Sequence, residues 1–296
     1  MRIALLLLAA LTLALPGPVQ AQSPTLPTPL RVVASFSILA DMARQVGEDR
    51  VTVRALAGPD QDLHGFEPRP SDIQAVAQAD VLIVNGLGLE GWAKRIADAA
   101  GFHGVTVVAT RGIATRDIAA RAGPDPHAWQ DLANARQYVA NIRDGLVAAD
   151  PARAPATTAA AARYRAELAA LDSEIRALFA AIPRAQRRIV TSHDAFAYFA
   201  AAYGIDMHAV SGTWRDAEPS ARELATLAAQ VKRQNIRALF LENAGNPAAL
   251  RALASETNTK IGGQLYADAL SPPNGPAATY TAMMRHNAQT IAAALR

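Results

Sequence analysis

The chain has 296 residues, with 51% hydrophobic residues, 19% charged residues and a formal net charge of +3. This length allows one large domain or two lobes with their own cores, and the composition is that of a globular rather than a disordered protein. The small net charge, without a basic stripe between aromatic residues, argues against nucleic acid as a partner. The absence of cysteine excludes disulfides, zinc–cysteine sites and cysteine nucleophiles.

The first residues have the three parts of a secretion signal. Arg2 supplies a positive charge, residues 3–15 are an unbroken apolar run, and residues 19–21 have the small-residue form of a cleavage site. The apolar run is too short to span a bilayer comfortably, and no basic cluster follows it. We therefore expect a signal peptide at 1–21, a flexible leader at 22–30 and a periplasmic protein. Because there is no cysteine after the signal, we expect no lipid anchor.

Strand and helix patterns alternate through the first half of the mature chain. Such alternation is typical of a mostly parallel sheet with helices on both faces. The predicted strands are 31–37, 51–57, 81–84 and 105–109. The predicted helices are 38–47, a short one capped by Ser71, 89–96, and 132–150 with an N-cap at Asp131.

A long helical pattern occupies the middle of the chain. Its apolar residues step by three and four between Tyr164 and Ile182, and prolines at 155 and 183 bound it. At 1.5 Å per residue such a helix spans about 40 Å, more than one small lobe needs. An ordinary amphipathic surface helix has the same pattern, but the central position of this one favours a strut between two lobes.

The alternation of strands and helices resumes after Pro183. Strands are predicted at 188–191, 206–210, 238–241 and 260–267, with helices between them and at the end of the chain. We therefore predict an α/β fold of two lobes, each a mostly parallel sheet flanked by helices, joined by one long rigid helix. The expected bounds are 31–150 for the N-terminal lobe, 151–183 for the connecting helix and 184–296 for the C-terminal lobe.

Three of the six histidines stand in loops or just after strands, each with an aspartate within two residues. They are His64, His127 and His193, and Asp268 ends the last predicted strand. Ligand sites of open α/β sheets lie outside the carboxyl ends of the strands, so these four residues can meet between the lobes. Three imidazoles and a carboxylate suit a divalent transition metal. Spacing alone leaves open that they are capping or surface residues, because no local pair such as His-x-x-x-His exists.

Several motifs stand in a characteristic order along the chain. They are ASFSILAD (34–41), DLHGFEP (62–68), DPHAW (125–129), SHDAF (192–196), EPS (218–220) and QLYAD (264–268). Together they resemble the motifs of the metal-binding solute-binding proteins of zinc and manganese ABC transporters, the ZnuA/TroA-like family. The resemblance spans nearly the whole mature chain.

This resemblance implies metal ligands at His64, His127, His193 and Asp268, in a cleft between two α/β lobes. It implies a protein that captures a divalent metal ion and delivers it to a membrane permease without catalysis, and we expect a monomer. A third imidazole at position 193 favours Zn²⁺, because manganese-type relatives tend to have a carboxylate there. Zinc is therefore the expected metal and manganese the alternative.

Other residues of these motifs are expected to surround the ligands. The acids are interpreted as supporting or structural groups, and two aromatic residues as walls of the site. For Glu242 a solvated loop carboxylate is an equal alternative, and whether a water or Glu67 completes the shell stays open. The acids are Glu67, Asp125, Asp194 and Glu242, the aromatic residues are Phe66 and Trp129, and the histidines outside the motifs are His103, His208 and His286.

Two departures from the family pattern bear on the metal and on the rim of the cleft. Many zinc-specific members have a long His/Asp-rich loop before the second ligand, whereas 110–123 is short and has no histidine. Trp214 and Arg215 replace a small, polar run, with an undetermined effect on the rim. The competing classes are a secreted metallohydrolase and a surface adhesin. No His-Glu-x-x-His or Gly-x-Ser-x-Gly motif supports the first, and the lack of an anchor cysteine speaks against the second.

Overall fold

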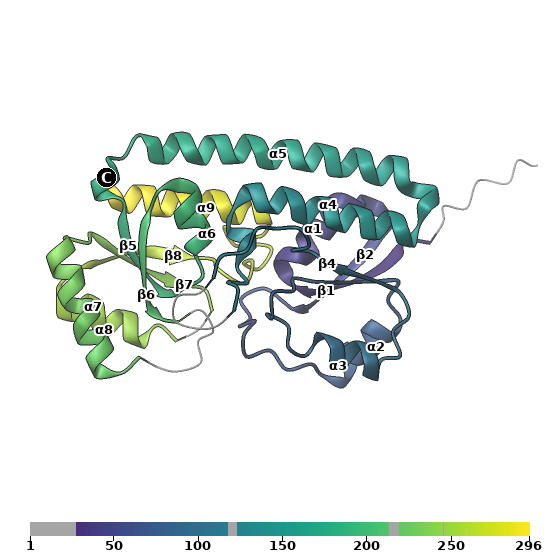
Figure 1. Cartoon of the computed structure of the whole chain (residues 1–296), viewed down its shortest axis with the longest axis horizontal. Helices are drawn as coiled ribbons and strands as arrows, with labels where there is room; N and C mark the ends of the chain where they lie inside the picture. The colour runs from purple at the N-terminus through teal and green to yellow at the C-terminus, as the bar shows by residue number, and fades with distance from the viewer. Residues whose placement is uncertain (1–27, 118–122, 213–218, 245) are drawn as a thin grey trace, which may run out of the picture.

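Two sheets of parallel strands lie side by side along one long helix, as Figure 1 shows for a computed structural model of the chain. The expected signal peptide at 1–21 and most of the leader lie outside the described residues, and so do Trp214 and Arg215. The described residues are 28–117, 123–212, 219–244 and 246–296.

The first sheet is built from the first half of the chain. Its strands are β1 (Leu30–Phe36), β2 (Val51–Ala57), β3 (Val81–Val84) and β4 (Val105–Val108). Its helices and 3-10 turns are α1 (Ser37–Gly47), η1 (Glu48–Arg50), α2 (Pro70–Ala77), α3 (Ala93–Ala99), η2 (Ala128–Gln130) and α4 (Leu132–Ala149). The strand order is β2-β1-β3-β4, and all neighbouring strands are parallel. Helices α1 and α4 cover one face, and α2 and α3 cover the other (Figure 1).

The second sheet repeats this plan in the second half of the chain. Its strands are β5 (Arg188–His193), β6 (Asp206–Ser211), β7 (Ala238–Glu242) and β8 (Lys260–Leu265). The helices and the 3-10 turn that precedes β5 are η4 (Arg184–Gln186), α6 (Ala197–Tyr203), α7 (Ala221–Gln234), α8 (Ala248–Thr257) and α9 (Tyr280–Leu295). The order is β6-β5-β7-β8, again parallel throughout. The predicted fold class, two mostly parallel sheets flanked by helices and accompanied by a long helix, is confirmed.

The central strands are covered on both faces, which explains their continuous apolar runs. In β1, Val32 and Ala34 belong to the core that faces the long helix, whereas Val33 packs with the helices of the opposite face. In β5, Ile189 and Val190 divide in the same way. Successive side chains of a strand point to opposite faces, so only a strand buried twice can be apolar at every position.

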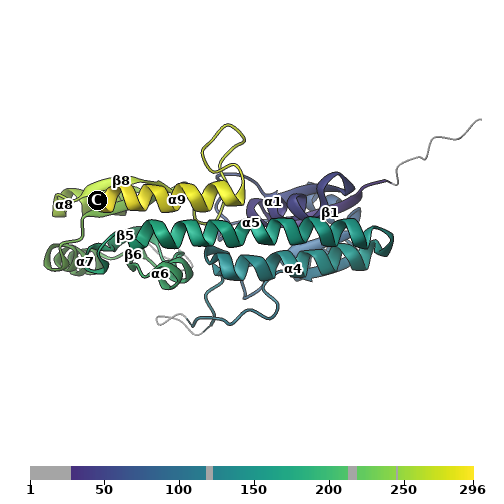
Figure 2. The same ribbon diagram turned by 90° about the horizontal axis from the view of Figure 1, so that it is seen from above.

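The long helix is α5 (Ala154–Ala180), which follows a short turn η3 (Pro151–Arg153). Seen from above in Figure 2, α5 runs past both sheets, with α9 along one side and α4 along the other. Its buried residues, Leu168 among them, join a core that also contains Phe36 of the first sheet and Phe240 of the second. The long helix is therefore part of one continuous apolar core that reaches both sheets. Within the described residues, no helix combines the length and apolarity needed to cross a bilayer.

The two sheets share a topology that the sequence does not reveal as a repeat. In both, the register of the two central strands is equivalent. This register places Phe36 and Asn85, at the ends of β1 and β3, where His193 and Glu242 stand at the ends of β5 and β7. The strand-end residues of the two halves thus differ in chemistry although the backbones correspond, and for this reason the repeat is absent from the sequence pattern.

One predicted helix cap is confirmed and another is wrong. The Asp131 carboxylate accepts a hydrogen bond from a backbone N–H in the first turn of α4, as an N-cap does. Ser71, in contrast, lies inside α2, which begins one residue earlier at Pro70. Proline suits the first helical position because its φ is already helical and its missing N–H is not needed there. The Asp72 carboxylate then reaches back to the N–H of Arg69, which precedes the helix.

Candidate metal centre

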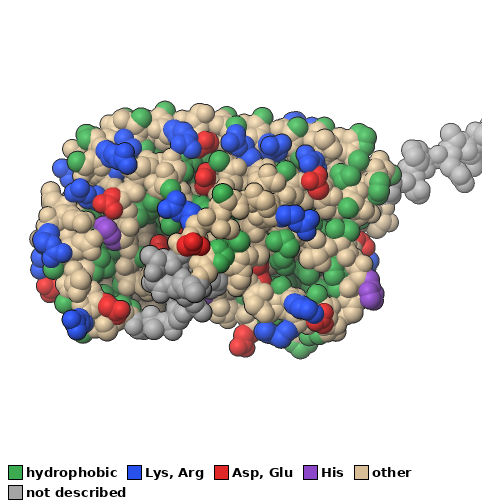
Figure 3. Space-filling model, viewed as in Figure 1, with side chains coloured by type: hydrophobic (Ala, Val, Ile, Leu, Met, Phe, Trp, Pro, Cys, Tyr) green, Lys and Arg blue, Asp and Glu red, His purple; other side chains and the backbone are tan. Residues whose placement is uncertain are grey.

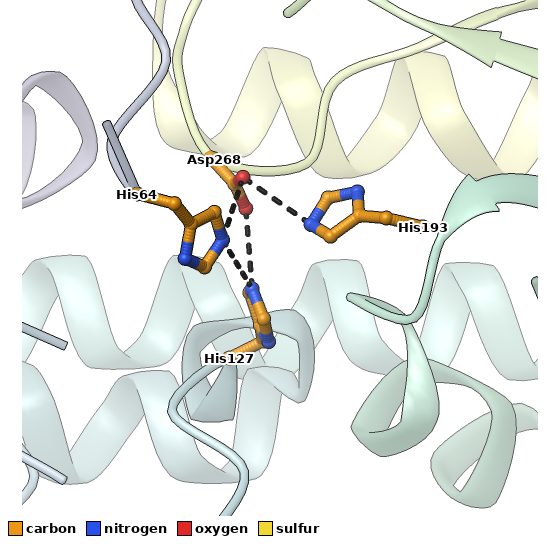
Figure 4. Close-up of side chains that lie close together, drawn as sticks. All are labelled: His64, His127, His193 and Asp268. Carbon is orange, nitrogen blue, oxygen red and sulfur yellow. Dashed lines mark hydrogen bonds and ion pairs between the residues drawn. The ribbon is translucent and has the colours of Figure 1, made fainter. Parts of the chain in front are cut away.

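The four candidate ligands come together between the carboxyl ends of the two sheets, as Figure 4 shows. His64 lies in the loop after β2, and His127 directly precedes η2. His193 is the last residue of β5, and Asp268 follows β8. One potential ligand atom of each residue lies within 4.8 Å of those of the others. All four residues singled out in the sequence are thus neighbours in space.

Four of the distances between candidate donor atoms match those of a tetrahedral shell. Nε2 of His64 is 3.4 Å from Nε2 of His127 and 3.3 Å from Oδ2 of Asp268. Nε2 of His193 is 3.3 Å from the same carboxylate oxygen, and Nε2 of His127 is 3.4 Å from Oδ1. Four donors at about 2.0–2.1 Å from a tetrahedral Zn²⁺ ion lie about 3.3–3.4 Å from one another. The cluster therefore fits a single small divalent cation at its centre.

The four side chains are buried, and the charges of their neighbours shift the pKa values of Asp268 and His193. The side chains of His127, His193 and Asp268 are at most 1% exposed, and that of His64 is 5% exposed. Burial opposes ionisation of Asp268, but the nearby His193 and His64 outweigh it and hold the pKa of the carboxyl well below its usual range. Burial also opposes the charged form of His193, but Glu242 and Asp268 outweigh it and raise the pKa of His193 to about 9. Both shifts favour an ionised carboxylate at Asp268 paired with a protonated imidazole at His193 when no metal is bound.

A rigid turn orients the His127 ring. Oδ1 of Asp125 accepts a hydrogen bond from the backbone N–H of His127 at 2.9 Å and lies 2.8 Å from its ring Nδ1. A proton on Nδ1 leaves the lone pair of Nε2 directed at the other candidate ligands. Pro124 and Pro126 restrict the backbone on either side of Asp125. The aspartate that precedes His127 in the sequence is therefore the group that selects the tautomer of its ring.

A buried polar network holds this turn against the first sheet. Nδ2 of Asn85 donates to the carbonyl oxygen of Pro126 at 2.9 Å, and Oδ1 of Asn85 accepts from the hydroxyl of Tyr138 at 2.5 Å. The carboxylate of Glu90 accepts from the N–H of Asn85 and from the hydroxyl of Ser35. Burial raises the pKa of Glu90. In the sequence, Asn85 directly follows a fully apolar strand, and a polar residue in that position is a usable signal for such a role.

A different acid orients His193. The backbone N–H of His193 donates to Oε1 of Glu242 at 2.9 Å, and ring Nδ1 of His193 contacts Oε2 of the same carboxylate. Glu242 is 8% exposed, so the alternative of a solvated loop carboxylate is wrong. The neighbouring Asp194 is exposed, although its place beside His193 in the sequence suggested a pairing. Nδ1 of His193 is thereby occupied, and Nε2 faces Asp268.

The loop that carries His64 is more exposed to solvent than the segments that carry His127 and His193. Oδ1 of Asp62 accepts from the backbone N–H of His64 at 3.0 Å, which closes a local turn. A cavity of about 560 Å³ begins at His64 and is lined by Phe66, Glu67 and Trp92, among others. Glu67 is exposed and is not part of the four-residue cluster. The His64 side is thus where the buried shell comes nearest to solvent among the described residues.

The comparisons with known proteins agree with this arrangement. The family model described as "Zinc-uptake complex component A periplasmic" matches residues 32–294. The chain belongs to this family. The manganese-binding lipoprotein MntA of Halalkalibacterium halodurans is 35% identical over 266 residues, 90% of this chain and 88% of that protein. The iron-binding protein YfeA of Yersinia pestis is 31% identical over 274 residues, 88% of this chain and 85% of that protein.

Solved structures of family members have the same fold. The periplasmic zinc-binding protein TroA of Treponema pallidum superposes with a TM-score of 0.86 at 28% identity, covering 90% of this chain and 99% of that one. A manganese-bound periplasmic metal-binding protein of Candidatus Liberibacter asiaticus superposes with a TM-score of 0.82 at 28% identity, covering 90% and 100%. The named relatives thus include proteins for zinc, manganese and iron, and the two solved structures have the fold of this chain.

One expectation about this member of the ZnuA family is overturned by its relatives. Several of them are named as lipoproteins, among them MntA of H. halodurans and of Bacillus subtilis and PsaA of Streptococcus anginosus. The expected absence of a lipid anchor is therefore wrong by this comparison. An extracytoplasmic location agrees with these names and with the periplasmic description of the family.

The remaining residues singled out in the sequence have defined surroundings. The Trp129 ring lies edge-on to His127, with 5.2 Å between centroids, and so forms a wall of the cluster. The Phe66 ring packs on that of Trp92 with 5.1 Å between centroids. The three other histidines are not part of the four-residue cluster. His103 is exposed, His208 contacts the side chains of Gln230 and Gln234, and ring Nε2 of His286 lies 3.0 Å from the carbonyl oxygen of Gln264.

Proposed function

We propose that this protein captures a divalent transition metal outside the cytoplasm and delivers it to the membrane permease of an ABC transporter. The ligands of the ion are Nε2 of His64, His127 and His193 and the carboxylate of Asp268. One observation carries the proposal: four buried donors from four separate segments converge at the spacing of a single metal shell. Membership of the ZnuA family supports the transport role.

We propose zinc as the metal, with manganese as the alternative. Three imidazole nitrogens and one carboxylate are an N-rich set of the kind that Zn²⁺ prefers, and the donor spacing suits tetrahedral coordination. Manganese prefers more oxygen ligands and higher coordination numbers. It has support from two observations: the relatives named for manganese, and the two oxygens of Asp268, which both face histidine nitrogens and so allow bidentate binding.

The captured ion replaces a proton. In the metal-free site the pKa of His193 is raised, so its protonated ring pairs with the carboxylates of Asp268 and Glu242. The divalent ion displaces this proton and supplies the positive charge beside the two carboxylates instead. Metal affinity then falls as the pH falls, because a protonated imidazole has no lone pair for the metal. In this proposal 31–150 and 184–296 act as the two lobes, 151–183 as their connection, and residues 1–21 direct export.

We propose a binding protein rather than an enzyme, acting as a monomer and without nucleic acid. Four protein donors are the number that fills a tetrahedral shell, whereas a catalytic zinc keeps one position open for water. The matched relatives are likewise named as binding proteins. On the face seen in Figure 3, basic and acidic side chains are interspersed rather than gathered into a basic stripe.

The test is a competition titration of metal-stripped protein with Zn²⁺ and Mn²⁺, followed by bound-metal content and melting temperature. We expect one ion per chain, a higher melting temperature with metal, and tighter binding of Zn²⁺. His193→Ala should weaken Zn²⁺ binding strongly. A stoichiometry near zero for both ions refutes the proposed function, whereas tight Mn²⁺ with weak Zn²⁺ overturns only the choice of metal.

A further inference from the structure

The segment that carries Asp268 leaves the second sheet before it reaches the site. Strand β8 ends at Leu265, two residues earlier than the sequence predicts. The next residue, Tyr266, bonds through its N–H and its carbonyl oxygen to the side-chain amide of Asn287 in α9. Asp268 is thus displayed on a segment outside the sheet, and its position depends on whatever holds that segment.

The segment is held from the first half of the chain, on the side of Asp268 nearer the sheet. The carbonyl oxygen of Ala267 accepts two hydrogen bonds, from Nε1 of Trp129 and from Nε2 of Gln130, both at 2.9 Å. Both donors belong to η2, the turn that begins directly after His127. One short turn therefore directly follows one candidate ligand and donates two hydrogen bonds to the residue next to another.

The far side of Asp268 is tied to the first half as well. The N–H of Leu270 donates to the hydroxyl of Ser37 at 3.0 Å, and its carbonyl oxygen accepts from the N–H of Asp60 at 3.0 Å. Asp60 belongs to the loop that carries His64. Asn243 of the second half also donates to the carbonyl oxygen of Ala269 at 3.3 Å. On both sides of Asp268, however, the backbone is additionally bonded to the turn after His127 and to the loop that carries His64.

Gln130 is the least expected member of this arrangement. Its side chain is fully buried, and a buried amide destabilises a protein unless hydrogen bonds compensate for lost hydration. An apolar side chain of similar length would fill the same space without that penalty. A glutamine at this position donates a hydrogen bond to Ala267, whereas a methionine or leucine has no donor for it. Trp129 is also fully buried and contacts Phe36 and His127 with its ring, so it combines packing with the same bond.

We propose that Gln130 and Trp129 are positioning residues for Asp268. By fixing the Ala267 carbonyl they hold the Asp268 carboxylate within 3.4 Å of Nε2 of His64 and His127 before metal arrives. His193 depends instead on Glu242 of its own sheet. This inference rests on the proposed function, because it concerns how the same site reaches its affinity.

The test is Gln130→Met, which removes the donor and keeps the length of the side chain. Gln137→Met is the matched control, because Gln137 is an exposed glutamine of α4 whose amide donates to the side chain of Asn141, away from the metal centre. We expect Gln130→Met to weaken Zn²⁺ binding about 10–100-fold, the usual effect of losing a group that orients a ligand. The visible spectrum of the Co²⁺-loaded variant should also change, because a displaced carboxylate alters the coordination of the metal. Gln137→Met should do neither.

A double-mutant cycle separates positioning from general destabilisation. In an Asp268→Asn background, Gln130→Met should have little further effect on affinity, because the ligand it positions is already impaired. In a His193→Ala background its full effect should persist. Should Gln130→Met fail to fold, as judged by circular dichroism of the metal-free protein, Trp129→Phe removes the other donor and takes its place.

The outcomes are distinct. Wild-type protein that binds no metal refutes the proposed function and this inference together. Wild-type protein that binds metal, with unchanged affinity in both Gln130→Met and Trp129→Phe, refutes the positioning role alone. A loss of affinity that is equally large in the Asp268→Asn background also overturns it, because the effect then does not pass through Asp268.

Discussion

Glu242 at the end of β7 contacts both the backbone N–H and ring Nδ1 of His193 at the end of β5. The two residues are 49 positions apart in the chain, and adjacent parallel strands make them neighbours. In the first sheet the corresponding strand ends hold Phe36 and Asn85. In the second sheet, a ligand and its orienting acid therefore stand at these two positions. In the first sheet the same positions hold a residue of the core, Phe36, and a residue that bonds to the turn before His127, Asn85.

Replacing Glu242 should weaken metal binding more than its distance from the ion suggests. Glu242→Gln keeps an oxygen for the N–H of His193 but removes the charge beside Nδ1, so the ring loses its fixed tautomer and basicity. We expect Zn²⁺ affinity to fall about 10–100-fold, measured by competition with a chromophoric chelator. Glu67→Gln, at an exposed acid of the His64 loop, should change affinity little. Equal effects of the two substitutions would argue against an orienting role for Glu242.

The raised pKa of His193 predicts a pH-dependent stability of the metal-free protein. A histidine titrates near pH 6.5 in the unfolded chain, whereas the pKa of His193 is about 9 in the folded protein. The folded state thus holds the proton more tightly. The resulting stabilisation, on the order of 3 kcal/mol, is fully present below about pH 6.5 and is lost as the pH rises through about 9.

The measurement is the free energy of unfolding of metal-free wild type and His193→Gln at about pH 6 and about pH 9.5. The advantage of the wild type over the variant should shrink at the higher pH. His103→Gln, at an exposed histidine, serves as the control and should show no such trend. A difference between wild type and His193→Gln that is the same at both pH values contradicts the prediction.

The network around Asn85 should contribute to stability and to metal binding together. Asn85→Ala removes the donor to the Pro126 carbonyl and leaves the Tyr138 hydroxyl without its acceptor. Two buried polar groups then lose partners, and we expect a loss of about 2–5 kcal/mol in chemical denaturation. Zn²⁺ affinity should also fall, because Pro126 precedes His127. Tyr138→Phe deletes one bond only and keeps the bond to Pro126. A loss of Zn²⁺ affinity as large as that of Asn85→Ala would therefore show that the network does not act through Pro126.

The close packing of α4 on β4 predicts one intolerant glycine. A Cβ atom added to Gly145 would lie 2.1 Å from Cγ2 of Val107, whereas one added to Gly91 meets nothing within 4 Å. Gly145→Ala should lower the free energy of unfolding by about 1–3 kcal/mol, despite the better helix propensity of alanine. Gly91→Ala should be close to neutral in the same thermal or chemical unfolding experiment. A stabilised Gly145→Ala protein would show that α4 can move away from the sheet at little cost.

Much of the fold could be predicted from local patterns. The apolar runs of β1, β3, β5 and β7 predicted strands because a strand covered on both faces has no polar side. Asp131 was identifiable as a cap because capping is a contact within one turn. The predicted boundary at Ser71 was wrong because Pro70, one residue earlier, suits the first helical position and begins the helix.

The candidate ligands could be selected from the sequence, but strand-end position alone left capping or surface roles open, and the family resemblance was needed to group them. His64, His127, His193 and Asp268 each stand in a loop or at a strand end, and parallel strands bring such ends to one edge. The groups that support them were only partly identifiable. Asp125 lies two residues before His127 and was an evident partner, whereas Asp194 beside His193 is exposed and its role belongs to Glu242.

The sequence by itself therefore determined the order of strands and helices, because that order depends on residues close together in the chain. For the cluster it supplied four candidates at strand ends and in loops, which the family resemblance then grouped into one site. Only the tertiary structure decided which acid orients His193 and that the first half of the chain shares in holding Asp268. Those contacts join segments separated by 49 residues for Glu242 and His193 and by 137 for Gln130 and Ala267. They depend on which strands are adjacent and where each strand ends, and no local pattern contains that information.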